Sequence, residues 1–144
     1  MSNPRIGLVG CVKRKLLQAA PARDLYTSDL FLGRRAFVER SCNSWYILSA
    51  LHGLVEPSRV LEPYDRSLKD VSAAERRAWS TMVVGDLKRT LGNLAGMTFE
   101  IHAGTEYREF GLHQGLEREG ARVEIPAKGL RMGEQLSFYV GQRP

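Results

Sequence analysis

The stretch that decides the predicted fold is W-Y-I-L-S-A-L-H-G-L-V-E-P-S-R-V-L-E-P-Y-D-R-S-L, residues 45–68. The apolar run Trp45–Leu48 predicts a buried strand. It ends abruptly in small and polar residues, and Pro57 and Pro63 stiffen the irregular loop that follows. Open α/β sheets bind ligands just beyond the C-terminal ends of their strands, on loops that carry polar, titratable groups. The stretch therefore predicts a strand of an α/β sheet with a ligand site beside it.

Similar apolar or alternating segments recur along the chain, with helical patterns between them. The predicted strands are Ile6–Val9, Trp45–Ser49, Thr98–Ala103 and Arg122–Ile125. Four helices are predicted. The first covers Leu30–Glu39 and is capped by Asp29, and the second follows the capping box Ser72–Glu75 and runs to about Leu91. The third runs from a Thr105 cap to about Arg118, and the last covers Glu134–Val140. The predicted loops are Lys13–Ser28, which has room for one helical turn, Glu56–Leu68 and Lys128–Gly133.

This alternation of strands and helices predicts a three-layer α/β/α sandwich with a mostly parallel central sheet of about four or five strands. The length of 144 residues fits one domain, residues 1–144. The C-terminal ends of parallel strands meet at one edge of such a sheet. We therefore expect four segments rich in glycine and polar residues to converge in one crevice: 10–11, 49–52, 103–104 and 126–129.

The composition is ordinary for a soluble globular protein, with 43% hydrophobic and 26% charged residues. No apolar run approaches the roughly 18 residues of a membrane span, and the N-terminus lacks the pattern of a signal peptide. The two cysteines, Cys11 and Cys42, form neither a disulfide framework nor a Cys-x-x-Cys pair. These features predict a cytoplasmic protein without a membrane partner, and they leave its oligomeric state open.

The net charge of +5 favours polyanionic partners such as nucleic acid or nucleotides. A basic soluble protein without such a partner is an equally good interpretation of the charge alone. The basic residues do cluster, at 13–15 after the first strand and at the pairs 34–35 and 76–77 in predicted helices.

Asp65, His52 and Cys11 are the residues of the predicted crevice that could carry chemistry. A carboxylate such as Asp65 can act as a general base or stabilise a developing cation, although loop aspartates more often cap turns. His52 could donate to an anion or transfer a proton, or simply pack on the sheet edge. Lys13 and Lys15 could activate the Cys11 thiol, but they suit phosphate contact better, and Cys11 is favoured as a small residue at a tight turn.

The tyrosines, histidines and glycines are weaker indications of a functional site. Tyr26, Tyr64 and Tyr107 could stack on a base or pack as half-buried side chains. We expect His102 to be structural and His113 to be solvated, and the scattered histidines form no metal motif. The glycines match neither a phosphate-binding loop nor a dinucleotide fingerprint, so no cofactor is predicted.

Six motifs, taken in order, carry a family resemblance: G-C-V-K-R-K (10–15), D-L-Y-T-S-D-L-F (24–31), I-L-S-A-L-H-G-L-V (47–55), E-P-Y-D (62–65), A-G-T-E-Y (103–107) and P-A-K-G-L-R-M-G-E-Q-L (126–136). The chain resembles a family of small bacterial and phage domains that is similar to the domain attached to archaeosine synthase and other relatives of tRNA-guanine transglycosylase. It departs from the pattern at Gly10 and Val12, where serines flank the cysteine, and at Leu51 and His52, where a lysine and an aromatic residue are usual.

The resemblance implies a fold like that of uracil-DNA glycosylase and work on nucleobases, by binding them or by cutting or exchanging an N-glycosidic bond. The motif positions that it carries over are Cys11, Lys13, Lys15, Tyr26, Ser28, Ser49, Gly53, Leu54, Pro63, Tyr64, Asp65, Gly104, Tyr107, Gly129, Gly133 and Gln135. Asp65, with His52, is then the candidate catalytic group.

Three hypotheses for the function follow. In the first, the chain is a DNA-glycosylase-like N-glycosidase that releases a nucleobase, with a modified base favoured, from nucleic acid or a nucleotide. In the second, the same crevice binds nucleic acid or a nucleotide without chemistry. In the third, Cys11 serves a thiol-dependent enzyme.

Overall fold

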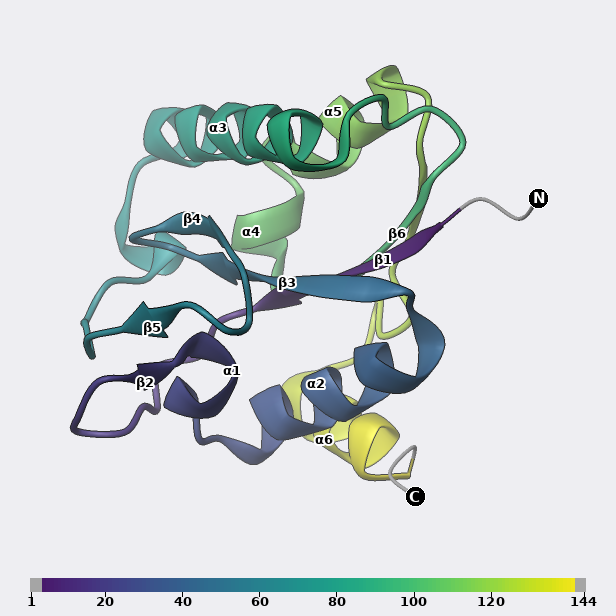
Figure 1. Ribbon diagram of the computed structural model, residues 1–144. Helices are drawn as coiled ribbons and strands as arrows, with labels where there is room; N and C mark the ends of the chain where they lie inside the picture. Colours follow the sequence, from purple (N-terminus) through teal and green to yellow (C-terminus); the bar gives the residue numbers. More distant parts are fainter. Residues whose placement is uncertain (1–3, 142–144) are drawn as a thin grey trace.

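Five strands form the central sheet, in the order β4-β3-β1-β6-β7 (Figure 1). Their bounds are Arg5–Gly10 (β1), Ser44–Ser49 (β3), Gly53–Val55 (β4), Thr98–His102 (β6) and Arg122–Glu124 (β7). The pairs β1–β3, β1–β6 and β6–β7 are parallel, and β4 alone runs antiparallel, beside β3. The computed structural model describes residues 4–141. It confirms the expected mostly parallel central sheet.

Helices cover both faces of this sheet. Their bounds are Ala22–Leu25 (α1), Asp29–Ser41 (α2), Ala73–Leu91 (α3), Thr105–Arg108 (α4), Leu112–Arg118 (α5) and Met132–Gly141 (α6). In Figure 1, α3, α4 and α5 lie on one face, and α1, α2 and α6 lie on the other. A short 3₁₀ helix, Leu68–Asp70, precedes α3. The expected three layers are therefore present.

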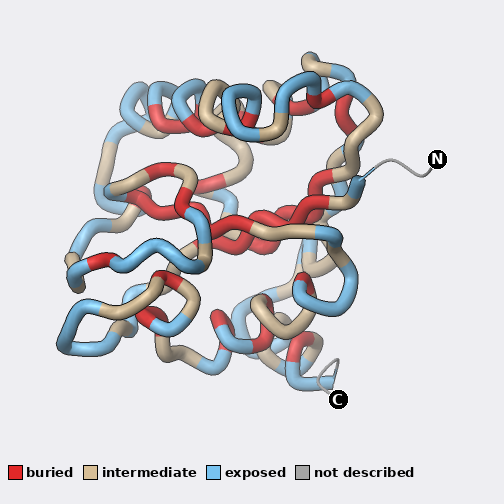
Figure 2. The backbone as a smooth tube through the Cα atoms, in the orientation of Figure 1, coloured by how far each residue is buried: buried red, intermediate tan, exposed pale blue. Residues whose placement is uncertain are grey.

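The alternation of side chains along β1 explains the two-sided core. Leu8 and Val9 are both fully buried but belong to different apolar clusters, because successive side chains of a strand point to opposite faces. Leu8 shares its cluster with Leu87 of α3, whereas Val9 shares its cluster with Phe31 of α2. Figure 2 shows the buried residues concentrated along the central strands.

The order of the parallel strands creates a switch point between β1 and β6. The connection from β1 to β3 runs through α2 on one face, whereas the connection from β6 to β7 runs through α4 and α5 on the other. Ligands of open α/β sheets bind at the C-terminal end of such a switch point. The two strand ends lie close together, since a Cβ at Gly10 would approach the Cβ of Ala103 to 2.7 Å.

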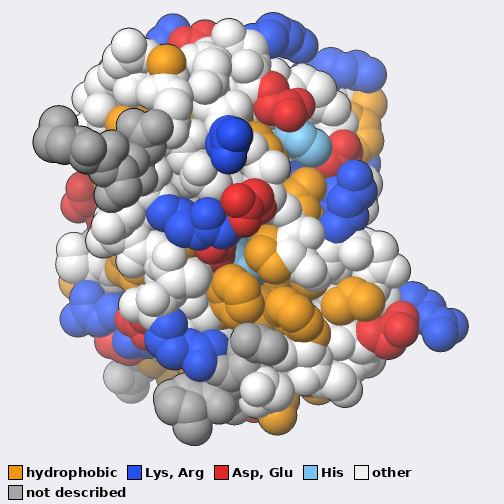
Figure 3. Space-filling model, turned by 90° about the vertical axis from the view of Figure 1, so that its right-hand side faces the viewer, with side chains coloured by type: hydrophobic (Ala, Val, Ile, Leu, Met, Phe, Trp, Pro, Cys, Tyr) orange, Lys and Arg blue, Asp and Glu red, His pale blue; other side chains and the backbone are white. Residues whose placement is uncertain are grey.

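The opposite edge of the sheet is a surface of mixed charge. Figure 3 shows the side of the molecule on which β1 begins, where acidic and basic side chains lie interspersed. Arg5, the first residue of β1, forms salt bridges with Glu100 and Glu124. Arg5 is thus paired at this edge, whereas the polar segments that follow the strands lie at the opposite, switch-point edge.

Three local predictions were wrong. The expected helix from Thr105 to Arg118 is two helices, because Gly111 lies between them at φ 127°, a conformation that L side chains rarely adopt. Ser28, not Asp29, caps α2: its side chain accepts a hydrogen bond from the Phe31 N–H at 3.1 Å. Asp29 is already the first helical residue, where a negative charge suits the helix dipole.

The third wrong prediction concerns the loops, which contain more regular structure than expected. The segment Gly53–Val55 turns back on β3 as β4, and Ala20–Pro21 (β2) pairs with Val60–Leu61 (β5) in a separate two-stranded sheet. This small sheet joins the predicted loops 13–28 and 56–68, and it fixes the path of the chain that leads to Asp65. The turn expected within residues 13–28 is α1.

Candidate functional site

Tyr64 anchors the E-P-Y-D segment to the C-terminal end of β3. Its hydroxyl lies 2.5 Å from the Tyr26 hydroxyl and 2.7 Å from Oγ of Ser49, the last residue of β3. Ser49 Oγ also accepts a hydrogen bond from the His52 N–H at 3.0 Å. Tyr26 and Ser49 are almost completely buried, and burial raises the pKa of both tyrosines. We call Tyr26, Tyr64 and Ser49 the hydroxyl cluster.

Lys15 lies over this cluster and close to Asp65. Its ammonium is 4.6 Å from the centre of the Tyr64 ring and donates to the Lys13 carbonyl at 3.1 Å. Burial lowers the pKa of Lys15, while electrostatic interactions with Cys11 and Asp65 act in the opposite direction. Asp65 is exposed to solvent. A solvent-accessible carboxylate therefore lies within electrostatic reach of a half-buried cation.

Cys11 joins the hydroxyl cluster to the other face of the sheet. Its Sγ lies 3.3 Å from the hydroxyl of Tyr107 in α4. The Tyr107 ring packs edge-on against Trp79, and Trp79 Nε1 donates to the Ser49 carbonyl at 2.9 Å. Burial, and then the electrostatic interaction with Cys11, raises the pKa of Tyr107 and of Tyr64. The thiol thus lies at the centre of these contacts, packed against the apolar clusters of both faces of the sheet.

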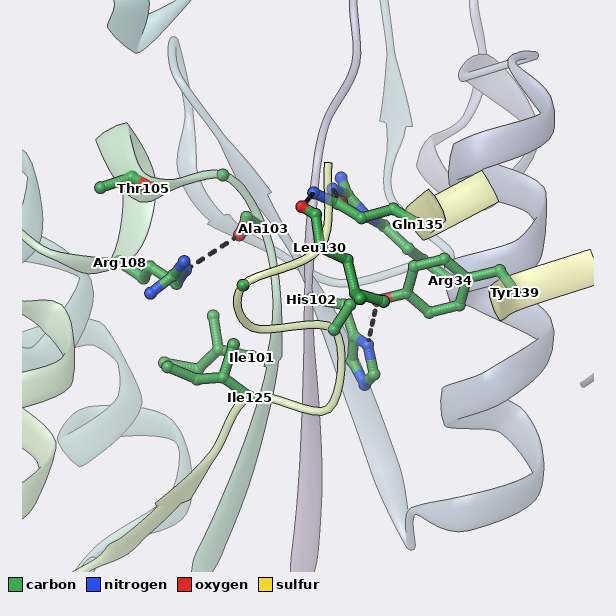
Figure 4. A pocket seen from close by; sticks show the side chains of 13 residues that line it. Arg34, Ile101, His102, Ala103, Thr105, Arg108, Ile125, Leu130, Gln135 and Tyr139 are labelled. Carbon is green, nitrogen blue, oxygen red and sulfur yellow. Dashed lines mark hydrogen bonds between the residues drawn. The ribbon is translucent and has the colours of Figure 1, made fainter. Parts of the chain in front are cut away.

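A cavity of about 260 Å³ opens beside this centre, at the ends of β6 and β7 (Figure 4). Its lining residues are Arg34, Ile101, His102, Ala103, Gly104, Thr105, Arg108, Ile125, Ala127, Gly129, Leu130, Gln135 and Tyr139. The lining holds two arginines and, among the described residues, no carboxylate. We call it the arginine cavity.

Arg34 is the unusual residue of the arginine cavity, because this charged residue is only 5% exposed. It comes from α2 and donates to the Gly10 carbonyl at 3.4 Å and to Gln135 Oε1 at 3.3 Å. Its Nε–H has no hydrogen-bond partner. Gln135 is held in turn by a 2.9 Å bond to the Leu130 carbonyl. Burial lowers the pKa of Arg34, and the nearby Tyr139 hydroxyl only partly opposes this effect.

Arg108 reaches the arginine cavity from the other face of the sheet. It comes from α4, and its Nε donates to the Ala103 carbonyl at 3.3 Å, as Figure 4 shows. Its Nη1 lies 2.9 Å from Glu109 Oε1, so its charge is paired. The two arginines thus flank the sheet edge, one paired and one unpaired.

A buried network supports the floor of the arginine cavity. His102 Nδ1 lies 2.7 Å from the Tyr139 hydroxyl, and its Nε2 lies 3.0 Å from Glu100 Oε1. Burial alone would raise the pKa of Glu100, but hydrogen bonds from His102, Arg5 and Ser41 outweigh it and lower the pKa to about 2. Burial lowers the pKa of His102 despite its bond to Glu100, so the imidazole is neutral at neutral pH. His102 is buried within a network, as expected of a structural histidine.

A family model described as "Family of unknown function (DUF6884)" matches residues 6–141 of the sequence. The chain belongs to the DUF6884 family. The matched segment contains every residue of the hydroxyl cluster and of the arginine cavity. No curated protein shows a significant match to the sequence.

In this DUF6884 domain, six of the predicted binding residues come together around the end of β1: Cys11, Lys15, Tyr26, Ser49, Tyr64 and Tyr107. Gly104, Gly129 and Gln135 instead line the arginine cavity. Asp65 lies near Lys15 with its carboxylate in solvent.

The other predicted residues lie apart from this centre. Lys13 is exposed, Ser28 caps α2, and Gly53 makes the turn into β4, in which Leu54 pairs with Leu48. Gly133 lies in the first turn of α6.

His52 packs edge-on against Tyr64, but it lines a separate cavity between β4 and α3 together with Arg59. Burial and the charge of Arg59 lower its pKa, so His52 is neutral at neutral pH. Its backbone N–H, not its imidazole, bonds to the hydroxyl cluster.

Sequence reasoning missed Arg34, Arg108, Tyr139 and Glu106 of this DUF6884 crevice. Glu106 folds its carboxylate over Gly104, so that a Cβ at Gly104 would lie 2.5 Å from Glu106 Oε1. A signal for Arg34 was present, because it occupies the buried stripe of its helix. Within residues 4–141, no three His, Cys, Asp or Glu side chains are grouped as metal ligands, and no helix is both long and apolar enough to cross a membrane.

Proposed function

We propose that this domain is an N-glycosidase that releases a nucleobase, most readily a modified one, from nucleic acid or a nucleotide. The observation that carries the proposal is the accessible Asp65 carboxylate beside Lys15 and Tyr64, at the C-terminal edge of a parallel sheet. Breaking the bond between C1′ of the sugar and the base builds positive charge on the sugar. A fixed carboxylate stabilises that charge, or accepts a proton from the attacking water.

The surroundings of Asp65 suit a base that has left its stack. Lys15 can neutralise negative charge on the departing base or on a neighbouring phosphate, and the Tyr64 ring beneath it offers an aromatic surface. The net charge of +5 favours a polyanionic substrate. We also propose that the fold is of the uracil-DNA glycosylase type, with support from the motif resemblance and from the switch point between β1 and β6.

Base release from oligonucleotides tests the proposal. Single-stranded and duplex DNA and RNA carrying a panel of normal and modified bases would be incubated with the protein, with abasic sites detected by alkaline cleavage and free base by mass spectrometry. Asp65→Asn should lower the rate by roughly 100-fold or more, because it removes the charge and keeps the shape. Glu62→Gln, on the same exposed loop, is the matched control and should keep the wild-type rate.

Each other outcome has a distinct meaning. Equal rates for wild type and Asp65→Asn would remove Asp65 from the mechanism, and a loss in Glu106→Gln instead would assign the role to the second carboxylate at this edge. No base release from any substrate would reject the glycosidase. Salt-dependent binding without turnover would then favour a module that binds nucleic acid or nucleotides.

A further inference from the structure

We propose that the arginine cavity is a binding site for a phosphate group, with Arg34 as its principal donor. The cavity is separate from the hydroxyl cluster and adjoins it at the end of β1. The inference does not depend on glycosidic cleavage, since a phosphate can be held with or without chemistry at Asp65.

The first argument is the unpaired charge of Arg34. An arginine that is only 5% exposed is normally matched by a carboxylate, because an uncompensated buried charge is strongly unfavourable. Among residues 4–141, Arg34 forms no salt bridge. Its hydrogen bonds to Gln135 and Gly10, at 3.3 and 3.4 Å, are longer than ordinary N–H···O bonds, and its other polar neighbour is the Tyr139 hydroxyl, which carries no charge to match the guanidinium. Its Nε–H is buried without a partner. This arrangement leaves donors of a planar fork ready for an anion.

The second argument is the charge of the lining. Arg34 and Arg108 approach the cavity from opposite faces of the sheet, on α2 and α4, and the described lining residues include no Asp or Glu. Glu106 is close enough to act on the pKa of Arg34, but it does not line the cavity. Arg108 is paired with Glu109, so the uncompensated positive charge of the lining comes from Arg34, and it favours a negatively charged ligand.

The third argument is size and position. The cavity volume of about 260 Å³ is smaller than that of pockets that enclose a drug-sized ligand. The cavity therefore suits one charged group of a ligand, and the remainder of the ligand would extend outward. Arg34 donates to the carbonyl of Gly10, and the next residue, Cys11, contacts Tyr107. A nucleotide with its phosphate at Arg34 would therefore extend along the strand ends toward Lys15 and Tyr64. This is why we identify the anion as a phosphate of a nucleotide.

The nitrogen-15 NMR signal of Arg34 Nε, identified by its loss in Arg34→Gln, tests this site directly in the wild-type protein. Inorganic phosphate and a nucleoside 5′-monophosphate should each shift that signal in a saturable way, whereas the nucleoside without phosphate should not. Calorimetric titration of the variants gives the affinities. Arg34→Gln should weaken monophosphate binding by roughly tenfold or more, because a charge-assisted fork is lost. Arg34→Lys should show a smaller loss.

Arg35→Gln is the matched control, since Arg35 is the next residue of α2 but pairs with Asp24 and Glu39 on the surface. It should bind the monophosphate as the wild type does. A dinucleotide without terminal phosphate distinguishes the two sources: binding as tight as that of the monophosphate assigns the site to the backbone of nucleic acid, and weaker binding assigns it to free nucleotides.

The proposal is overturned if phosphate leaves the Arg34 signal unmoved, if the nucleoside binds as tightly as its monophosphate, or if a folded Arg34→Gln binds as well as the wild type. Its failure is distinguishable from that of the glycosidase. Phosphate binding without base release from any substrate would support the phosphate site alone, and base release without phosphate binding would support the glycosidase alone.

Discussion

Replacing Arg34 by methionine should make the protein more stable, even though it removes a polar side chain that contacts two groups. Methionine has a flexible chain of comparable length and can fill the space along α2 without carrying a charge. A buried charge without a counter-ion opposes folding, and replacing buried ionic groups by well-packed apolar ones is often stabilising. The Arg34→Met variant therefore tests whether the protein needs Arg34 for folding or only for binding a ligand.

The expected change in the free energy of unfolding follows from the contacts of Arg34. One N–H is buried without a partner, which costs about 1–3 kcal/mol, and removing the charge relieves a desolvation penalty of several kcal/mol. Against this, two hydrogen bonds at 3.3 and 3.4 Å are lost, and their length places them at the weak end of the usual range. We expect the free energy of unfolding to rise by about 1–3 kcal/mol. For a domain of this length the melting temperature should then rise by roughly 3–10 °C.

Urea denaturation in a phosphate-free buffer measures the free energy, with the fluorescence of the nearly buried Trp79 as one probe and circular dichroism as a second. Arg35→Met is the matched control on the same helix. Because Arg35 forms surface ion pairs, that change should lower stability by no more than about 1 kcal/mol.

A loss of more than about 1 kcal/mol in Arg34→Met would refute the reasoning, because it would show that Gly10 and Gln135 need the guanidinium for folding. A second comparison uses the ligand. A nucleoside monophosphate at 100 times its dissociation constant for the wild type should stabilise the wild type by about 2.7 kcal/mol, and Arg34→Met, which binds at least tenfold more weakly, by about 1.4 kcal/mol or less.

Two further predictions concern the supports of the site. Tyr64→Phe should lower the free energy of unfolding by about 1–3 kcal/mol in urea titrations, because it leaves the buried Tyr26 hydroxyl without its partner. The control is Tyr46→Phe, at a nearly buried tyrosine of β3, which should change the free energy of unfolding by less than about 0.5 kcal/mol. Equal losses of stability in the two variants would contradict a stabilising contact between Tyr64 and Tyr26. The pKa of Glu100 is about 2, below its usual 4.5, so this carboxylate stabilises the fold above pH 4.5 and loses that effect as the pH falls through 2. Between pH 5.5 and pH 3 the wild type should therefore lose about 2 kcal/mol more stability than Glu100→Gln, and parallel pH curves for the two proteins would refute this.

Sequence periodicity predicted the main layers because each long element has a local signature. The parallel strands are apolar runs or alternating segments, and Ser72 caps α3 by accepting from the Glu75 N–H at 3.1 Å. The two-residue strands β2 and β5 had no such signature, because two residues cannot show a period. Their pairing depends on the antiparallel approach of chain segments about forty residues apart, which no local pattern encodes.

Part of the candidate site was predicted from residues that follow strands, whereas Tyr26 and Tyr64 entered through the motif resemblance. Cys11 follows the last residue of β1 and Ser49 ends the neighbouring β3, so the rule for parallel sheets brought them together. Arg34 follows no strand, and it belongs to the face of α2 that also carries Leu30 and Val38, at a spacing of four residues on each side. An arginine on an apolar stripe is rare enough to mark a functional position, but its partners on α6 lie about a hundred residues away.

The position of α6 explains how such a charge can be held at the sheet edge. A Cβ at Gly33 would lie 2.5 Å from the Cβ of Tyr139, so only glycine lets α6 pack this closely on α2. That contact brings Tyr139 to His102 and places Gln135 beside Arg34. The arginine cavity is thus completed by the last helix of the fold. A phosphate bound there would contact groups held by α2, α4 and α6 together, and because it would bind only when α6 is docked, its binding free energy would add to the stability of that docking.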